Sequence, residues 1–484
     1  MVRRMLRPIV WPRVTMDPPT SRSLGSRGKY NIVGTGAQGL VRFGVNAAIG
    51  RLGGPELLGN TAAAMSAAQV AALFWPSSSG SAAAKFVARS RGSSRIDEAV
   101  GVAGFVHRNN ALATVIIALA AGLIWHFLGA GTDVGSLIAV VALTVGFSLY
   151  TVGRGTQLGA GKEKTAAILD VSTAFVALTG TVALLLLIGP SYFSLIPLAL
   201  SYLIYGLLSL PPAGPKDSPV ATELKVEINR FIIIAAFGTL ASAGFVQAAV
   251  IVTRQFAGPI AAGNYAAAMT LVSPVTLLAG TLAVSLFPSF SETWGSKEEA
   301  RYWKTVDGVF RKVALYATIG FSTYISASPV ISHVVWGERY AVTQTILPVI
   351  LAGYFFYTLA IPCTASLTST SNRGTMVAAS ASLLGATAGS TVWVLSGAHS
   401  AIEVSFGLFV GLFTTAFLPI VIIGKRGQIK WALPMLFGTL ALGESLIVAH
   451  YLREQNFMAA PVAFILVLTI VLFAGKIRKW EGET

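Results

Sequence analysis

The chain has 484 residues, of which 54% are hydrophobic and only 11% are charged, and its formal net charge is +15. A soluble domain carries about 25% charged residues, so this composition excludes an ordinary soluble protein. The single cysteine, Cys363, excludes an internal disulfide and a thiolate metal site, and the five histidines show no metal-ligand spacing. No metal or cofactor is therefore expected.

Apolar runs follow one another along the whole chain, and each is about 20 residues long, enough for a helix to cross a bilayer. We predict fourteen transmembrane helices, at residues 31–50, 57–83, 109–129, 135–153, 165–188, 191–210, 231–253, 262–289, 309–334, 343–366, 374–396, 402–423, 431–450 and 457–475. Pro76 and Pro274 fall inside the second and eighth runs, where proline predicts a break. The fold class is thus an all-α polytopic membrane protein.

Lys and Arg alternate in number between the two sets of loops. With a cytoplasmic N-terminus, 30 of them lie on the cytoplasmic side, 4 lie outside, and Arg42 lies within a helix. The positive-inside rule therefore predicts that both termini are cytoplasmic, and it explains the charge without a nucleic-acid partner. Residues 1–29 lack an apolar signal-peptide core, so we expect a disordered basic tail, with Met16 as an alternative start.

One loop and helix start is written twice. The stretch GPELLGNTAAAM begins at Gly54, and GPIAAGNYAAAM begins 204 residues later, at Gly258. Six predicted helices separate the copies, so both have the same orientation, as in a parallel repeat of two lobes around a central substrate. We predict an N-lobe over 30–210, a cytoplasmic linker over 211–230, a C-lobe over 231–423, and two further helices with a cytoplasmic tail over 424–484.

The stretch RLGGPELLGNTAAAMS resembles the first outer loop of the polysaccharide-transport flippases, which belong to the multidrug/oligosaccharidyl-lipid/polysaccharide exporter superfamily. Its signature of a basic residue, Leu-Gly and a second glycine is met by Arg51, Leu52, Gly53 and Gly59, whereas Asn60 stands where the family often has an aromatic residue. The resemblance implies two six-helix lobes plus two C-terminal helices. It also implies export of a polyprenyl-diphosphate-linked oligosaccharide across the plasma membrane, with glycosyltransferases or a polymerase as partners.

Polar residues in the first predicted helix suit such a cargo. Gln38, Arg42 and Asn46 follow one another at intervals of four and share one helix face. An unpaired arginine in mid-membrane costs about 3 kcal/mol or more, so Arg42 must face a wet cavity or a partner. Its planar fork suits a diphosphate, while the alternative is a buried arginine bonded to carbonyls of a neighbouring helix.

Three further residues are candidates for cargo contacts. Arg51 and Arg254 lie near the outer ends of the first helix of each lobe and predict a pair of outer phosphate contacts; the alternative is two ordinary interfacial arginines. Gln247 follows the repeat partner of Arg42 by one residue and offers a neutral donor on the opposite lobe.

Two acids in the predicted helices are candidates for coupling to a proton or sodium ion. Glu444 lies deep in the thirteenth helix. Asp170 lies in the first turns of the fifth, where a helix-dipole role is the simpler interpretation. The stretch GTGAQG, from Gly34 to Gly39, matches a dinucleotide-binding pattern but follows no strand, so its glycines predict close helix packing or bending of the helix.

Three functional classes remain open. A lipid-linked-saccharide flippase is favoured, and a lipid II flippase for peptidoglycan is its nearest competitor. A multidrug or cation antiporter of the same superfamily usually needs intramembrane carboxylates in a lobe, where this chain has Arg42. A polymerase or ligase usually needs large outer loops, and every predicted outer loop here is short, so the chain is not expected to be an enzyme.

Overall fold

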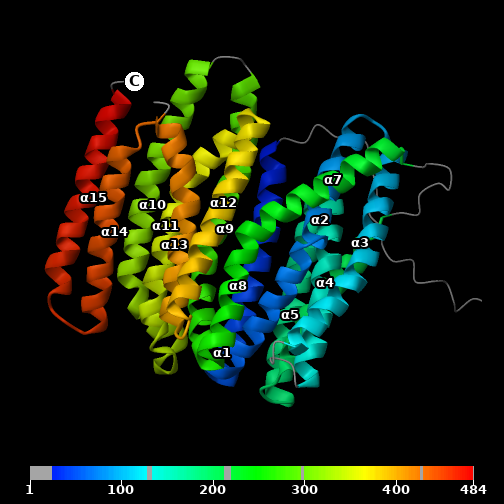
Figure 1. Cartoon of the computed structure of the whole chain (residues 1–484), viewed down its shortest axis with the longest axis horizontal. Helices are drawn as coiled ribbons and strands as arrows, with labels where there is room; N and C mark the ends of the chain where they lie inside the picture. The colour runs from blue at the N-terminus through cyan, green and yellow to red at the C-terminus, as the bar shows by residue number, and fades with distance from the viewer. Residues whose placement is uncertain (1–23, 128–132, 212–219, 296–298, 426–428, 483–484) are drawn as a thin grey trace, which may run out of the picture. The chain divides into compact units, whose positions relative to one another are not determined.

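The computed structural model describes residues 24–127, 133–211, 220–295, 299–425 and 429–482 (Figure 1). Almost all of these residues are helical, and none lies in a β-strand. The chain folds as two compact units. The first combines residues up to 53 with 60–251, and the second combines 54–59 with 252 onwards. The predicted all-α class is confirmed.

The first unit is built from the helices of the N-terminal half, which are α1 (Leu24–Leu73), α2 (Pro76–Gly92), α3 (Ile96–Trp125), α4 (Val134–Gly159), α5 (Glu163–Leu187), η3 (Tyr192–Leu195), α6 (Ile196–Leu208), α7 (Thr222–Thr239), η4 (Leu240–Gly244) and α8 (Phe245–Val252). The second unit follows with η5 (Thr253–Ala257), α9 (Pro259–Gly295), α10 (Glu299–Trp336), η6 (Glu338–Tyr340), α11 (Thr343–Thr370), α12 (Asn372–Ser396), α13 (Ala401–Lys425), α14 (Ala432–Arg453) and α15 (Ala459–Gly482).

These elements make fourteen helical segments among the described residues. In this count, α1 is divided at its non-helical residue Gly54, and its second half is joined to α2. The short elements η3, η4 and η5 are each counted with the helix next to them, and the single turn η6 is left out. The hydropathy predicts the same number, so this part of the fold is confirmed.

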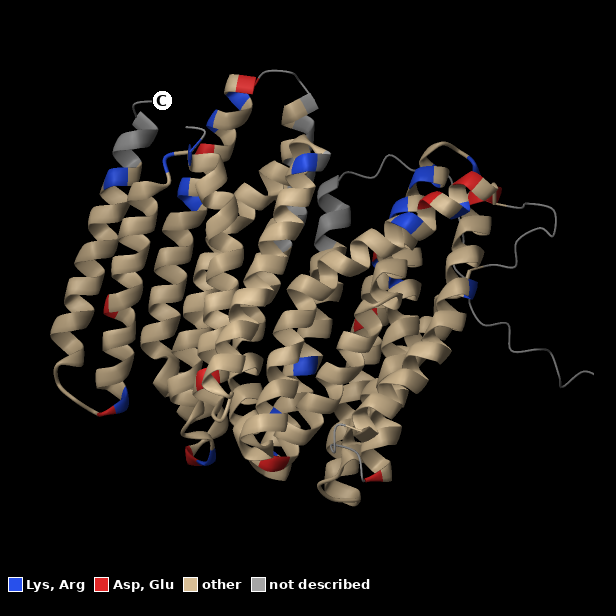
Figure 2. Cartoon of the chain, in the orientation of Figure 1, with Lys and Arg blue, Asp and Glu red and all other residues tan. Residues whose placement is uncertain are grey.

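The described segments have the length and composition of membrane helices. Ten are long and apolar enough to cross a bilayer, and the bent pair α1–α2 passes the same test as one span. The segment 192–208 is apolar but shorter. Within each unit, most Lys and Arg residues lie toward one end of the helices, and the middle stretches carry few charges (Figure 2). The chain is thus a multi-pass membrane protein.

The two prolines in long runs behave differently. α1 ends at Leu73 and α2 begins at Pro76, with a bend of 50° between them, so the predicted break is confirmed. Pro274 lies within α9, which continues as a helix from Pro259 to Gly295, so the break predicted there is wrong. A proline removes one backbone hydrogen bond, and the rest of the helix can retain its path when neighbouring bonds persist.

The repeated loop adopts the same backbone turn in both copies. Gly54 has φ +82° and ψ 179°, and Gly258 has φ +89° and ψ 171°. Only glycine adopts such angles readily, and in each copy the next residue is a proline that begins a helix. Within the second unit the copies also touch. A Cβ on Gly59 would lie 1.9 Å from the carbonyl oxygen of Pro259, and one on Gly263 would lie 1.9 Å from that of Pro55.

The first unit contains α7 and α8 because α7 packs on α2 and α3. Ile228 and Ile232 are buried in one apolar cluster with residues of those helices. At the surface, Arg89 of α2 and Glu227 of α7 form an ion pair of 2.8 Å, and Lys85 lies 4.3 Å from the ring centre of Phe231. The boundary of the first unit therefore falls after residue 251, whereas the predicted linker covers 211–230.

Candidate functional site

Arg42 on α1 is held by neutral groups. Its Nε donates to the hydroxyl of Tyr202 on α6 at 3.0 Å, and its Nη1 donates to Oε1 of Gln69 at 3.1 Å. Its guanidinium lies 5.2 Å from the ring centre of Phe147 on α4. Among the described residues it has no acidic partner, so its positive charge is not neutralised in the first unit.

A chain of hydrogen bonds leads from Arg42 to α8. Gln247 donates from Nε2 to the same Gln69 oxygen at 3.2 Å, and Ser66 donates to Oε1 of Gln247 at 2.9 Å. The sequence places Gln247 on the opposite lobe, yet it belongs to the same compact unit as Arg42. Two predicted site residues are thus joined through Gln69, which no sequence motif singled out. The sequence signal that could have found Gln69 is that it is a polar residue within an apolar run.

A small cavity opens beside Arg42. Its walls come from α1, α4 and α6, and the lining residues are Arg42, Met65, Ala68, Gln69, Leu143, Phe147, Leu198 and Tyr202. Its volume is about 10 Å³, which is room for roughly one water molecule. The site is therefore closed to a large ligand in this conformation, and the helices around it must separate before one can enter.

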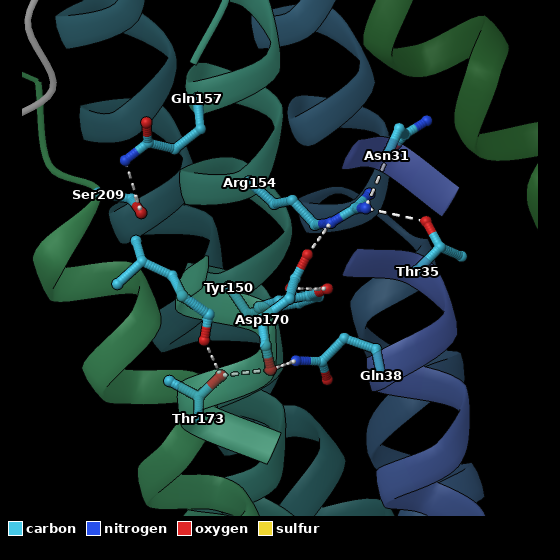
Figure 3. Close-up of polar contacts among 10 residues, drawn as sticks. Asn31, Thr35, Gln38, Tyr150, Arg154, Gln157, Asp170, Thr173 and Ser209 are labelled. Carbon is cyan, nitrogen blue, oxygen red and sulfur yellow. Dashed lines mark hydrogen bonds and ion pairs between the residues drawn. The ribbon is translucent and has the colours of Figure 1, made fainter. Parts of the chain in front are cut away.

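A second arginine of the same unit has an acidic partner. Arg154 on α4 donates from Nε to Oδ2 of Asp170 on α5 at 3.0 Å, and the two side chains are 18% and 0% exposed. Its Nη2 donates to Oδ1 of Asn31 and to the hydroxyl of Thr35, both on α1, at 3.0 and 2.9 Å. Figure 3 shows this ion pair between the helices, and we call Arg154, Asp170, Asn31 and Thr35 the Arg154 cluster.

The Arg154 cluster corrects two expectations from the sequence. The hydropathy ends the fourth helix at 153 and makes Arg154 a cytoplasmic loop residue, but α4 continues to Gly159 and Arg154 is half-buried within it. Asp170 lies two turns into α5, which begins at Glu163, beyond the first turn where the helix dipole acts. Its carboxylate instead accepts from Arg154 and, at 3.0 Å, from the hydroxyl of Tyr150.

Gln38 and Asn46 share the α1 face of Arg42 but not its partners. The Gln38 amide donates to the backbone oxygen of Asp170 at 3.1 Å, so this side chain contacts the Arg154 cluster and not Arg42 (Figure 3). Asn46 is half-buried one turn beyond Arg42. Nearby Gly34 allows α1 to approach α5, since a Cβ there would lie 2.5 Å from Oδ2 of Asp170. Close packing at this glycine is therefore confirmed, whereas nothing lies within 4 Å of such an atom at Gly36.

Aromatic rings connect the two arginine sites. The ring centres of Tyr150 and Tyr202 are 5.0 Å apart, and those of Phe147 and Tyr202 are 5.5 Å apart. Tyr150 bonds Asp170 and Tyr202 bonds Arg42, so one aromatic contact spans the distance between them. α4 carries two of these rings and is fixed closely on α2, because a Cβ on Gly155 would lie 2.0 Å from the Gly80 oxygen.

The remaining predicted residues lie elsewhere. Arg51 is exposed near the end of the first half of α1, and Arg254 is half-buried in η5 of the second unit. Glu444 lies on α14, where its Oε1 accepts from the hydroxyl of Thr469 on α15 at 2.9 Å. Its other oxygen is buried and has no hydrogen-bond partner among the described residues. No group of three or more His, Cys, Asp or Glu side chains in the described part of the chain is arranged to hold a metal.

The fold is similar to that of solved structures described as MurJ and MATE transporters. A structure described as lipid II flippase MurJ in an inward closed conformation matches with a TM-score of 0.69 and 12% identity, over 92% of this chain and 98% of that one. An inward-facing multidrug resistance MATE family transporter of the MOP superfamily matches with a TM-score of 0.61 and 14% identity, over 82% and 98%.

A third structure also has a similar fold. It is a MOP superfamily transporter from Pyrococcus furiosus, described as having a binding pocket of reverse polarity that suggests a different function. It matches with a TM-score of 0.58 and 14% identity, over 83% of this chain and 94% of that one. No family model and no curated protein matches the sequence. These similarities, at 12% to 14% identity, show the fold alone.

Proposed function

We propose that the chain is a flippase that exports a polyprenyl-diphosphate-linked oligosaccharide across the plasma membrane by alternating access. The fold supports a transporter. One observation favours an anionic cargo: Arg42 is a permanently charged group whose partners are all neutral. No acidic residue described in the first unit pairs with Arg42, and a diphosphate can supply that negative charge. A diphosphate binds a guanidinium through two parallel hydrogen bonds.

The walls of the cavity support a cargo with an apolar portion beside its charge. Phe147, Leu143 and Leu198 line it together with Arg42. Such a mixture of apolar walls and a few placed polar groups is typical of ligand sites. With a cytoplasm-negative membrane, outward movement of each negative charge is downhill by about 2.3 kcal/mol per 100 mV, so the membrane potential can drive part of the export.

A lipid II flippase is the second candidate, because the structure with a TM-score of 0.69 carries that description. Both cargoes share a polyprenyl diphosphate, so Arg42 suits either of them. A multidrug or cation antiporter is disfavoured by the same uncompensated charge. Growth of a strain depleted of its lipid II flippase, with and without this chain, separates the first two: rescue assigns lipid II, and failure of a membrane-inserted chain to rescue favours the oligosaccharide.

Substitutions at Arg42 test whether its charge binds the cargo. We predict that Arg42→Ala abolishes export, that Arg42→Lys retains part of it because the charge remains and the fork is lost, and that both reach the membrane. The measurement is lipid-linked precursor accumulating on the cytoplasmic leaflet, at matched protein levels. Normal export by Arg42→Ala would remove the main support for an anionic cargo.

The orientation proposed for this function has both termini in the cytoplasm, which the 30-to-4 distribution of Lys and Arg favours, and the bias remains 29 to 4 when Arg154 is counted inside α4. Arg51 and Arg254 then lie near the outer face and are proposed as outer phosphate contacts. Reporter fusions at residue 484 and in the 211–226 loop are expected to give a cytoplasmic signal. An external signal at either position contradicts the orientation.

A further inference from the structure

Gln69 on α1 is a polar side chain to which the proposed function has so far assigned no role. Its Oε1 accepts two hydrogen bonds, from Nη1 of Arg42 at 3.1 Å and from Nε2 of Gln247 at 3.2 Å. A carbonyl oxygen has two lone pairs, so both are in use. Gln69 is therefore the link between the cation and α8.

Arg42 determines the direction of the whole chain of hydrogen bonds. A guanidinium has only donors, so the oxygen of the Gln69 amide must face it. Gln247 must then present its nitrogen to the same oxygen, which turns its own oxygen toward the hydroxyl of Ser66. Each member has one available orientation, and the guanidinium is fixed in place without an ion pair.

The Arg154 cluster shows what a carboxylate does in the same unit. Asp170 holds Arg154 with similar geometry, at 3.0 Å, but it cancels the charge. An amide oxygen orients an arginine and leaves its full positive charge to attract an anion, whereas a carboxylate oxygen orients it and repels one. Glutamine and glutamate have nearly the same shape, so the difference at position 69 is one of charge.

We propose that Gln69 is a positioning residue that sets the charge selectivity of the Arg42 site: it orients the guanidinium for a diphosphate ester while leaving its charge uncancelled. The inference rests on the proposed function and deepens it. Gln247 and Ser66 support Gln69 by fixing its rotamer. A glutamate at position 69 converts the site into a neutral ion pair of the kind seen at Arg154 and Asp170.

The test uses the full chain in nanodiscs, with farnesyl diphosphate as the anionic probe, inorganic pyrophosphate as the headgroup alone, and farnesol as the uncharged chain. We expect Gln69→Glu to weaken farnesyl diphosphate binding by about 100-fold or more, because like charges brought together cost several kcal/mol. Gln69→Met keeps the side-chain length and removes the acceptor, so it is expected to weaken binding by about tenfold or less. Farnesol binding is expected to be unchanged in both.

The matched control is Gln157→Glu on α4, a buried amide whose Nε2 donates to Ser209 at 3.4 Å and which makes no bond to Arg42. It introduces the same charge into the same unit and is expected to bind farnesyl diphosphate within about threefold of the wild type, once a thermal melt has shown that it is folded. If it loses binding as strongly as Gln69→Glu, a general charge effect explains the result and the inference is wrong.

The remaining outcomes separate the inference from the function beneath it. If Arg42→Ala binds farnesyl diphosphate normally, the proposed function fails. If Arg42→Ala loses binding while Gln69→Glu keeps it, only the role of Gln69 fails. Equal losses of farnesyl diphosphate and farnesol by Gln69→Glu indicate a structural role and also overturn the inference.

Discussion

Arg42 and Arg154, two half-buried arginines of the first unit, differ in the partners that surround them. Arg154 is paired with Asp170 and held by two further oxygens of α1. Arg42 has a tyrosine hydroxyl, an amide oxygen and an aromatic ring. The first arrangement neutralises a charge and ties three helices together. The second retains a charge inside the protein, which is costly in a membrane and is expected where a ligand supplies the opposite charge.

The comparison predicts that changes to the Arg154–Asp170 pair affect stability more than changes at Arg42. Removing one partner of a buried ion pair leaves the other uncompensated and typically costs about 3–5 kcal/mol. Asp170→Ala is therefore expected to destabilise the protein more than any of the substitutions at Arg42, Gln69, Glu444 or Gly34. The measurement is the midpoint of thermal unfolding in detergent, which is expected to fall.

The control is the double variant Arg154→Met/Asp170→Leu, which removes both charges. It is expected to recover most of the midpoint, because replacing a buried pair by apolar residues is often neutral or stabilising. If Asp170→Ala unfolds at the wild-type midpoint, the Arg154 cluster does not hold these helices together.

Glu444 extends the comparison to the second unit. Its carboxylate has one hydroxyl partner, Thr469, and a second oxygen without one among the described residues, so it resembles Arg42 more than Asp170. As a hypothesis, Glu444 couples an ion to export. Glu444→Gln is expected to slow transport by about tenfold or to remove its pH dependence.

The control for Glu444→Gln is its expression and thermal midpoint, which are expected to match the wild type because the amide keeps the bond from Thr469. Wild-type transport rates across the pH range would show that Glu444 has no part in coupling.

The smallest expected effect concerns the close approach of α1 to α5 at Gly34. Gly34→Ala places a Cβ 2.5 Å from Oδ2 of Asp170, so the carboxylate must shift and the free energy of unfolding is expected to fall by about 1 kcal/mol. Gly36→Ala meets nothing within 4 Å and is expected to be neutral or slightly stabilising, since alanine favours helix. Equal midpoints for the two variants would show that the cluster tolerates the extra methyl group.

The sequence predicts most of this fold because hydropathy and charge act on long segments. The fourteen predicted apolar runs match fourteen helical segments in the described part of the chain, and the Gly-Pro pairs at Gly54 and Gly258 form two similar turns. The end of α4 and the break expected at Pro274 were exceptions. Arg154 stands after an apolar run and looks like a loop residue, but α4 continues through it, and its side chain is paired with Asp170.

The candidate site was only partly predictable. Arg42 is conspicuous as a lone charge in an apolar run, but its partners come from α4 and α6 and from a distant part of α1. Spacing along one helix grouped it with Gln38, which instead bonds α5. Gln69 and Tyr202 carry no local pattern of their own, because a glutamine and a tyrosine in apolar runs become site residues only through packing.

The most direct test of the account measures folding and binding together in Arg42→Met and Arg154→Met. Each variant is titrated with farnesyl diphosphate in nanodiscs and melted in the same buffer. The account predicts that Arg42→Met melts at or above the wild-type temperature and loses binding, whereas Arg154→Met melts lower and its folded fraction still binds. The account is contradicted if Arg42→Met is the unstable variant, or if it binds the diphosphate as the wild type does.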